Sequence, residues 1–455
     1  MSKLTKLIKN PKLFFIDAVK KRIDVKKASS KKPEVKKFSS KISAPTFETY
    51  QVNTFYPYKI ILHTGEGENG ITHLNLWIPI FQKSGINFVV LVRNYEVFKY
   101  VKEKYGELPI IMAKSDKEVK KILDKMQSLK ACFYPSNTGN NLHLLSYDDI
   151  KHIFIGHGDS DKTASAHKYF RVYDENWVAG QAHIDRFNNA GFDHTGLKHI
   201  KVGRPNLKET LLLTQDNWKN RFGGKINLLY LSTWEGVYKE QEYTSVEIIK
   251  EFFKDINEIL SEVHIKIKLH PWLGKRRKEL LNYDEKILKE WKSKIYKKNR
   301  NFQDMLKSNF NILNRYPKNL EITNLKFSEI NATLKIYSKE TPIEELIKTS
   351  NVFICDISAV ISEALAGNGP IFVYIPKNKP IKTLKSKMDY ADYTYTFSSI
   401  EELKEKFYEV VINGKDYLAD KREMAVEYIL GKKETLNDKF IQNLQCIEKG
   451  IEYEL

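Results

Sequence analysis

The chain has 455 residues, of which 42% are hydrophobic and 12% aromatic. This is enough apolar material for a packed core, so a wholly disordered chain is excluded, and the length predicts two or three domains. The formal net charge of +18 indicates an anionic partner such as a nucleic acid, an acidic membrane surface or a phosphorylated substrate. Three cysteines, far apart in sequence, give no disulfide framework and indicate a reducing cytoplasm.

The positive charge is concentrated at the N-terminus, where residues 2–41 contain 14 Lys or Arg and three acidic residues. Within residues 1–25, apolar side chains such as Leu4, Ile8 and Phe15 recur at helical spacing between lysines, which predicts a basic amphipathic helix on a membrane surface. A solvated tail is the main alternative, and a nucleic-acid-binding tail is weaker because no interleaved aromatic and basic pattern continues. Residues 26–49, rich in Lys and Ser, predict a flexible linker. No run approaches the ~18 apolar residues of a spanning helix, and no signal peptide is recognised.

Residues 50–210 alternate short apolar strands with helical stretches, which predicts a parallel α/β layer. The expected strands are Lys59–His63, Ile86–Val92, Leu108–Met112, Lys130–Tyr134, Asp149–Ile155, Trp177–Gly180 and Ile200–Gly203. The expected helices are Ile71–Lys83 and Lys117–Leu129. The glycine-rich loop Thr64–Gly70 is too irregular to cradle phosphate, and we expect it to face the acceptor or the other domain.

A second α/β set is expected over residues 211–400. Its strands are Ile226–Leu231, His264–Leu269, Val352–Cys355 and Ile371–Tyr374, and its helices are Tyr243–Ile259, Glu344–Thr349 and Ala359–Ala366. A Lys/Arg/Asn-rich stretch of about 273–330 reads as an insertion or surface excursion, and residues 401–455 read as C-terminal helices. The sequence therefore predicts an α/β fold of two Rossmann-like domains.

Two histidines follow predicted strands, one in each half. His157 lies between two glycines after the strand ending at Ile155, where a substrate can approach closely and where Asp159 could orient the ring of a general base. The alternative is a simple turn in which Asp159 caps a helix. His270 follows a predicted strand that Pro271 terminates. Its side chain could contact a phosphate, or it could form only a hydrogen bond to the backbone. The histidines have no metal-binding spacing, and we expect no metal and no cofactor.

The second half offers further candidate contacts for a nucleotide donor. Asp356 and Ser358 sit between a buried strand and a helix start, where backbone N–H groups favour phosphate, although either could be only an N-cap. Glu363, one to two turns into that helix, could accept hydrogen bonds from ribose hydroxyls. Thr233, after the strand 226–231, is another candidate phosphate contact.

These residues fall in ordered blocks that resemble the CDP-glycerol glycerophosphotransferase family, the transferases of teichoic acids and related capsule polymers. The blocks are Ile155–Lys162, Tyr173–Asp174, Val178–Gly180, Val202–Pro205, Leu229–Gly236, Lys268–Pro271 and Ser350–Val360 with Pro370–Tyr374. Three positions depart from the family pattern, namely Ser232, Ile357 and Ala359. The departures leave the donor open, and CDP-ribitol or another CDP- or CMP-activated donor is an alternative to CDP-glycerol.

The resemblance implies a glycosyltransferase-B fold held peripherally at the inner face of the cell membrane. It implies transfer of a polyol phosphate from a CDP-linked donor to a hydroxyl of a lipid-linked or polymeric acceptor, with release of CMP. The implied catalytic residues are His157 and Asp159, and the implied donor-binding residues are Thr233, His270, Asp356, Ser358 and Glu363. Lys162 and Arg204 are candidate contacts to phosphate or acceptor.

Two other functions fit the sequence. One is a glycosyltransferase of the same fold that moves a sugar from a nucleotide-activated donor in capsule or cell-surface polysaccharide synthesis. The other is a non-catalytic basic adaptor that binds an anionic membrane. We expect no nucleic-acid partner, because no aromatic-and-basic pattern of single-strand binding continues into the body of the chain.

Overall fold

The computed structural model describes residues 58–214, 216–239, 242–259, 262–298, 331–377 and 383–453, all within one compact unit of the chain. The amphipathic helix expected at residues 1–25 and the linker expected at 26–49 lie outside the described residues. Across these described ranges, every helix is too short or too polar to cross a bilayer.

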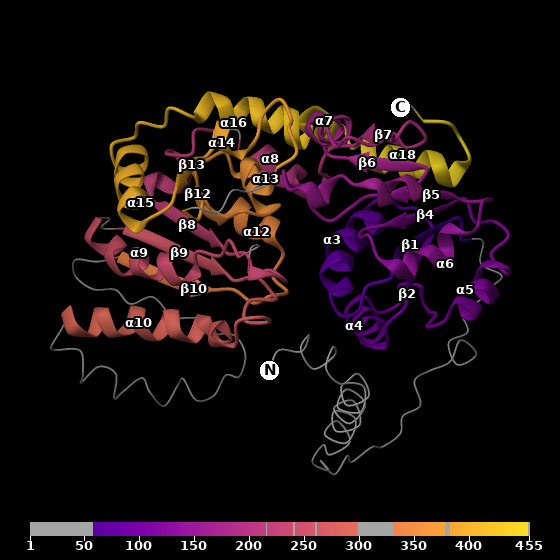
Figure 1. Ribbon diagram of the computed structural model, residues 1–455, viewed down its shortest axis with the longest axis horizontal. Helices are drawn as coiled ribbons and strands as arrows, with labels where there is room; N and C mark the ends of the chain where they lie inside the picture. The colour runs from indigo at the N-terminus through magenta and orange to yellow at the C-terminus, as the bar shows by residue number, and fades with distance from the viewer. Residues whose placement is uncertain are drawn as a thin grey trace, which may run out of the picture. The chain divides into compact units, whose positions relative to one another are not determined.

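The first half is built on a seven-stranded sheet whose neighbouring strands all pair in parallel. The strands are β1 (Ile60–Thr64), β2 (Phe88–Val92), β3 (Ile110–Met112), β4 (Ala131–Tyr134), β5 (Lys151–Phe154), β6 (Glu175–Val178) and β7 (Lys198–Lys201). Their spatial order is β3-β2-β1-β4-β5-β6-β7. This doubly wound order reverses direction between β1 and β4, and it confirms the parallel layer expected for this half (Figure 1).

Helices cover both faces of this sheet, which explains why β1 and β2 are buried along their whole length and are mostly apolar. The helices are α3 (Gly70–Lys83), α4 (Tyr95–Tyr105), α5 (Asp116–Leu123), α6 (Leu142–Leu145), α7 (Gln181–Asn188) and α8 (Lys208–Leu213). Helix α4 was not among the expected elements. Its start is fixed by Asn94, whose side chain accepts hydrogen bonds from the N–H groups of Glu96 and Val97.

The second half contains a six-stranded parallel sheet in the order β10-β9-β8-β11-β12-β13. The strands are β8 (Ile226–Leu231), β9 (Glu262–Lys268), β10 (Asn331–Ile336), β11 (Val352–Asp356), β12 (Ile371–Tyr374) and β13 (Tyr395–Phe397). The four inner strands match the expected ones. The two edge strands, β10 and β13, were not expected, because β10 is partly polar and β13 has three residues.

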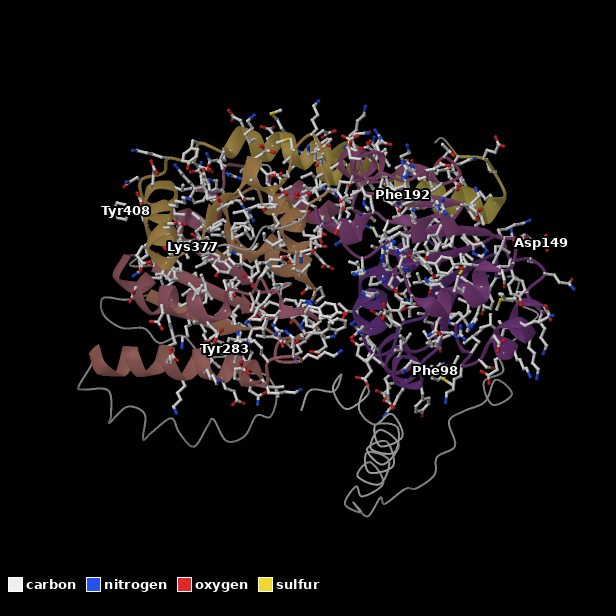
Figure 2. All side chains as sticks on the ribbon, in the orientation of Figure 1. Phe98, Asp149, Phe192, Tyr283, Lys377 and Tyr408 are labelled. Carbon is white, nitrogen blue, oxygen red and sulfur yellow. The ribbon has the colours of Figure 1, made fainter. Side chains whose placement is uncertain are left out.

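The helices of the second half include α9 (Val246–Ile259), α10 (Tyr283–Lys298), α12 (Ile343–Lys348), α13 (Val360–Ala364), α14 (Tyr390–Tyr393) and α15 (Ile400–Phe407). Helix α10 lies in the stretch expected to be an insertion or surface excursion. It contributes Ile287 and Trp291 to the core of the second sheet, and Tyr283 at its start is 5% exposed (Figure 2). Residues 273–298 are therefore part of the folded body, whereas residues 299–330 lie outside the described residues.

The last part of the chain returns to the first sheet. It contains α16 (Ala419–Ala425), α17 (Lys432–Leu436) and α18 (Lys439–Lys449). From α18, Phe440 stacks on Trp77 of α3 with ring centroids 4.9 Å apart and meets Trp177 of β6 edge-on at 5.2 Å. Phe440 belongs to the hydrophobic core of the first half, so α18 completes the domain that contains β1 to β7 (Figure 1).

Four strands lead directly into the candidate residues. His157 follows β5, Thr233 follows β8, His270 follows β9, and Asp356 is the last residue of β11. The carboxyl ends of strands are where ligands bind in open parallel sheets. The fold therefore brings the predicted residues to the expected edges of the two sheets.

Candidate active site

The loop after β5 presents the side chain of His157 to solvent. Gly156 adopts a left-handed conformation with φ of 62°, which a residue with a side chain rarely accepts. The Nδ1 atom of His157 lies 2.8 Å from the backbone oxygen of Pro135, the residue after β4. A carbonyl oxygen can only accept, so Nδ1 carries the proton, and the neutral ring keeps its lone pair on Nε2. This is the tautomer that can take a proton at Nε2.

Protein atoms packed around the imidazole lower the pKa of His157 below its usual value, even though solvent reaches the ring. Burial is the main cause, the hydrogen bond to Pro135 opposes it, and the positive charge of Arg204 lowers the pKa further. His157 is therefore neutral at pH 7. A histidine that is neutral at the working pH is ready to act as a base.

Helix α3 contacts the loop after β5 through Trp77 and His73. His73 was not among the residues predicted from the sequence. Trp77 donates from Nε1 to the backbone oxygen of Gly156 at 2.6 Å. His73, one turn earlier, stacks on His157 with ring centroids 3.9 Å apart and an interplanar angle of 21°. The signal available in the sequence was the spacing of four residues between His73 and Trp77, which places both on one face of the expected helix.

Asp159 does not orient the ring of His157. It is 4% exposed, and its Oδ1 pairs with Nη1 of Arg186 at 2.5 Å and with Nδ1 of His183 at 3.1 Å. Burial alone would raise the pKa of Asp159, but the positive charge of Arg186 and the hydrogen bonds from His183 and Arg186 hold it well below the usual value. The backbone oxygen of Pro135 takes the orienting role instead. Direct participation of Asp159 in catalysis stays a prediction.

The same loop is attached to the second half of the protein. Ser362 of α13 donates its hydroxyl to the backbone oxygen of Asp159 at 3.0 Å, and Leu384 donates its N–H to the backbone oxygen of Asp161 at 2.8 Å. The side chain of Asp161 accepts the N–H of Tyr390 at 3.1 Å. A Cβ at Gly158 would lie 2.9 Å from the Cβ of Ala359, so only glycine fits this approach without a shift.

Lys162 follows in this loop and faces the donor-side residues. It forms an isolated β-bridge with Thr383 and lines a small cavity together with Ser358 and Ser362. Its Nζ lies 5.5 Å from the ring centroid of Tyr243. Burial lowers the pKa of Lys162, and the nearby carboxylate of Asp356 opposes this effect. Lys162 and Ser358, predicted separately from sequence, are thus brought together.

Asp356 is fully buried, and both of its oxygens are occupied. Oδ2 accepts the N–H of Thr233 at 2.7 Å, and Oδ1 accepts the N–H and the hydroxyl of Ser245 at 3.1 and 2.5 Å. Burial raises the pKa of Asp356 to about 7, while the hydrogen bonds from Ser245 and Thr233 oppose the shift. With these partners Asp356 positions Thr233, which is itself 5% exposed, and direct donor contact by either residue stays a prediction.

His270 has the opposite proton arrangement to His157. The backbone N–H of Trp272 donates to its Nδ1 at 3.1 Å, so the neutral ring carries its proton on Nε2. Burial is the main cause that lowers its pKa to about 4, followed by the positive charges of Lys268 and Lys162. His270 is therefore a neutral hydrogen-bond donor through Nε2. Its ring stacks on the ring of Trp234, with the two ring centroids 6.2 Å apart.

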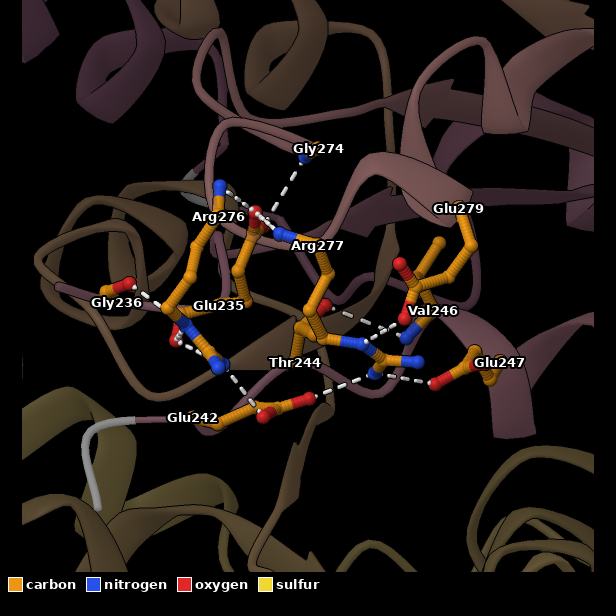
Figure 3. Close-up of polar contacts among 10 residues, drawn as sticks. All are labelled: Glu235, Gly236, Glu242, Thr244, Val246, Glu247, Gly274, Arg276, Arg277 and Glu279. Atoms are coloured by element: carbon orange, nitrogen blue, oxygen red, sulfur yellow. Dashed lines mark hydrogen bonds and ion pairs between the residues drawn. The ribbon is translucent and has the colours of Figure 1, made fainter. Parts of the chain in front are cut away.

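A buried carboxylate that the sequence interpretation missed fixes the loops around His270. Glu235 is 0% exposed and accepts backbone N–H groups from Gly274, Arg276 and Arg277 at 3.1, 2.6 and 2.8 Å (Figure 3). Burial alone would raise the pKa of Glu235, but the three backbone donors lower it. The basic run 275–278, expected to open an insertion, therefore ties the loop after β9 to the loop after β8.

The side chains of Arg276 and Arg277 extend this network. Arg276 donates to the backbone oxygens of Glu235 and Gly236 and to Glu242 at 2.6 Å. Arg277 reaches three carboxylates, with the contacts Glu242 at 2.7 Å, Glu247 at 2.7 Å and Glu279 at 2.8 Å (Figure 3). The charges of Arg276 and Arg277 are thus balanced by neighbouring carboxylates.

Glu363 and Arg204 form an ion pair from different halves, with Nη2 and Oε1 3.2 Å apart. Burial raises the pKa of Glu363 to about 7, against the opposing charge of Arg204, and the negative charge of Glu344 adds to the rise. Arg204 also lowers the pKa of His157, so it links the base-side and donor-side residues electrostatically. Contact of either residue with a ligand stays a prediction.

Among the described residues, no group of three or more His, Cys, Asp or Glu side chains has the geometry of a metal site. Cys132 and Cys355 are buried, and burial raises the pKa of both thiols. A thiolate nucleophile at either position is therefore disfavoured.

No family model and no curated protein matches the chain. Its fold is similar to that of the wall teichoic acid polymerase TagF, with a TM-score of 0.52 at 11% identity over 90% of this chain and 93% of that chain. A putative UDP-N-acetylglucosamine 2-epimerase from Listeria monocytogenes gives 0.51 at 10% identity over 87% and 99%. MnaA of S. aureus with UDP gives 0.50 at 12% identity over 87% and 98%. These likenesses confirm the predicted glycosyltransferase-B fold.

The raised pKa of Glu363 predicts a stability effect. Because its folded-state pKa is about 7 against an ordinary value of 4.5, the stability from its protonation is complete below about pH 4.5 and is lost as the pH rises to about 7. In Glu363→Gln, the decrease in the free energy of unfolding over this pH range should be smaller by on the order of 2–3 kcal/mol. Urea unfolding between pH 4.5 and 7.5 measures it. Glu345→Gln, at an exposed position of α12, should keep the wild-type slope; equal slopes in all three proteins would contradict the prediction.

Proposed function

We propose that the protein transfers glycerol phosphate, or a related polyol phosphate, from a CDP-activated donor to a hydroxyl of a teichoic-acid-like or capsular polymer. The observation that carries the proposal is His157, whose backbone contact to Pro135 leaves Nε2 free to accept a proton at the end of β5. The ordered sequence blocks supply the substrate class. The fold supports a nucleotide-linked donor, since TagF and the UDP-bound MnaA have the same architecture.

The described residues can account for the proton and for the leaving group of this reaction. Nε2 of His157 takes the proton of the acceptor hydroxyl, and the acceptor oxygen attacks the phosphorus that carries the polyol. The bond from this phosphorus to the bridging oxygen breaks, and CMP leaves with the electron pair. The negative charge on the leaving phosphate is stabilised by Lys162 and by the Nε2–H donor of His270.

Transfer of a sugar from a nucleotide-activated donor is the second candidate function. The observation that favours it is the nearly equal likeness of the fold to a putative UDP-N-acetylglucosamine 2-epimerase, whose name indicates a nucleotide-linked sugar as its substrate. A thermal-shift panel of CDP-glycerol, CDP-ribitol, CMP and UDP-sugars separates the two, because a ligand that binds the folded state raises its melting temperature. Stabilisation by CDP-linked compounds alone supports the polyol phosphate transfer, and stabilisation by UDP-sugars alone overturns it.

The first prediction from this mechanism concerns the base. His157→Ala should lower the rate of CMP release from CDP-glycerol by roughly 10²–10⁴-fold and leave donor affinity nearly unchanged, because the base acts on the acceptor. His264→Ala is the control, since His264 lies on β9 and pairs with Thr333 of β10. Near-normal turnover in His157→Ala would remove the base assignment, whereas the absence of any turnover in the wild type would favour the non-catalytic adaptor.

The second prediction concerns the donor. His270→Gln should weaken binding of CDP about 10–100-fold, because a hydrogen bond to a charged phosphate contributes about 1.5–3 kcal/mol. Calorimetric titration of CDP and CMP into the full chain measures the change. His264→Gln should bind as the wild type does. Unchanged CDP affinity in His270→Gln would place the donor phosphates elsewhere.

The third prediction concerns the basic N-terminal segment. We propose that this segment holds the protein at the inner face of the cell membrane. Deleting residues 1–25 should release the chain from anionic vesicles, and the full chain should dissociate as salt rises past about 0.15 M, where the Debye length is ~8 Å. The apolar stripe is short, so basic residues must supply most of the binding. Co-sedimentation with anionic and neutral vesicles measures this. Equal binding by both proteins would assign the membrane site to the body.

A further inference from the structure

One face of α3 is devoted to the loop that carries the candidate base. His73 and Trp77 are four residues apart, so both project from the same side of the helix. Trp77 bonds to the backbone oxygen of Gly156, and His73 covers the ring of His157. The two adjacent residues of the loop are thus each held by one residue of α3.

The choice of histidine at position 73 is costly for packing alone. Its Nδ1 atom is buried and has no hydrogen-bond partner among the described residues. A buried polar atom without a partner costs about 1–3 kcal/mol, and a phenylalanine would fill the same place without this cost. Residues that break a local packing rule are expected at functional positions.

The geometry points to His73 as a positioning residue: its ring holds the imidazole of His157 in the orientation that bonds to Pro135 and presents Nε2 to the acceptor hydroxyl. This inference rests on the proposed function for its catalytic consequence. The orientation itself can be tested without any substrate.

Two contacts hold the ring of His157, and the charge of Arg204 acts on it electrostatically. The backbone oxygen of Pro135 fixes Nδ1, the ring of His73 fixes the plane, and Arg204 supplies a positive charge. A rotation of the ring by half a turn would break the bond to Pro135 and move Nε2 away from the acceptor. A planar neighbour in face-to-face contact restricts tilting of the ring.

The two rings are also coupled electrostatically. Burial lowers the pKa of His73 well below the ordinary value, and the charge of His157 lowers it further. Two positive charges at this separation repel each other, so the pair accepts its second proton only at lower pH than its first. At pH 7 both rings are neutral, and the stacked pair leaves His157 in its base form.

The substrate-free experiment uses the full chain with histidine labelled at the ring positions. In the wild type the Nδ1 proton of His157, held by Pro135, should give a resolved downfield NMR signal that His157→Gln removes. His73→Phe should keep this signal, because a planar ring remains, and His73→Ala should broaden it beyond detection. A sharp, unshifted signal in His73→Ala, in a protein that melts like the wild type, would overturn the inference.

The kinetic experiment measures CMP release from CDP-glycerol. His73→Ala and His73→Leu should lower kcat about 10–100-fold with little change in the donor KM, because the base is misplaced while donor binding is intact. His73→Phe should restore kcat to within about threefold of wild type, and His264→Phe is the matched control. An inactive His73→Phe would mean that a ring nitrogen is needed and would overturn the positioning role. If the wild type releases no CMP, the proposed function fails, while the NMR result still decides whether His73 positions the ring of His157.

Discussion

The position of the loop that carries the candidate base depends on one buried guanidinium. Arg186, which is 0% exposed, pairs with Asp159 at 2.5 Å and with Asp161 at 2.9 Å. Removing one partner of such a buried pair leaves an uncompensated charge, which costs about 3–5 kcal/mol, so the three residues act as a unit. The same loop residues bond to Ser362 and Leu384 of the second half. One ion cluster therefore fixes the loop to α7, and through the loop it ties the base to the donor-side sheet.

Backbone groups, rather than carboxylates, assign opposite roles to the two strand-end histidines. At His157 a carbonyl oxygen accepts from Nδ1, which leaves Nε2 as an acceptor of protons. At His270 a backbone N–H donates to Nδ1, which leaves Nε2–H as a donor. Both rings have lowered pKa values and are neutral at pH 7. Neutral rings in opposite tautomers offer one proton acceptor and one hydrogen-bond donor, which are the two groups that the proposed transfer from a phosphate donor to a hydroxyl would use.

The sequence predicted what depends on local patterns and missed what depends on long-range contacts. The alternation of apolar strands and helices predicted the two parallel sheets, and strand ends located His157 and His270. The edge strand β10 was missed because its polar residues weaken the pattern, and its pairing partner β9 lies about 70 residues away. The roles of Asp159 and Asp356 were not predictable, because their partners Arg186 and Ser245 are distant in sequence. His73 was missed because only the fold brings its ring onto the loop after β5.

The basic residues around His270 come from both halves of the protein, so binding of a phosphate ligand would depend on how the two sheets are placed. Lys162 belongs to the loop after β5, whereas Lys268 and His270 belong to β9 and the loop that follows it. Burial lowers the pKa of all three groups, and the positive charges of Lys162 and Lys268 lower the pKa of His270 further. Nearby carboxylates offset part of this effect, since Asp356 raises the pKa of Lys162 and Glu340 raises that of Lys268. In the proposed reaction, a bound diphosphate would add attraction from residues of both halves, so donor binding would be coupled to the position of the candidate base.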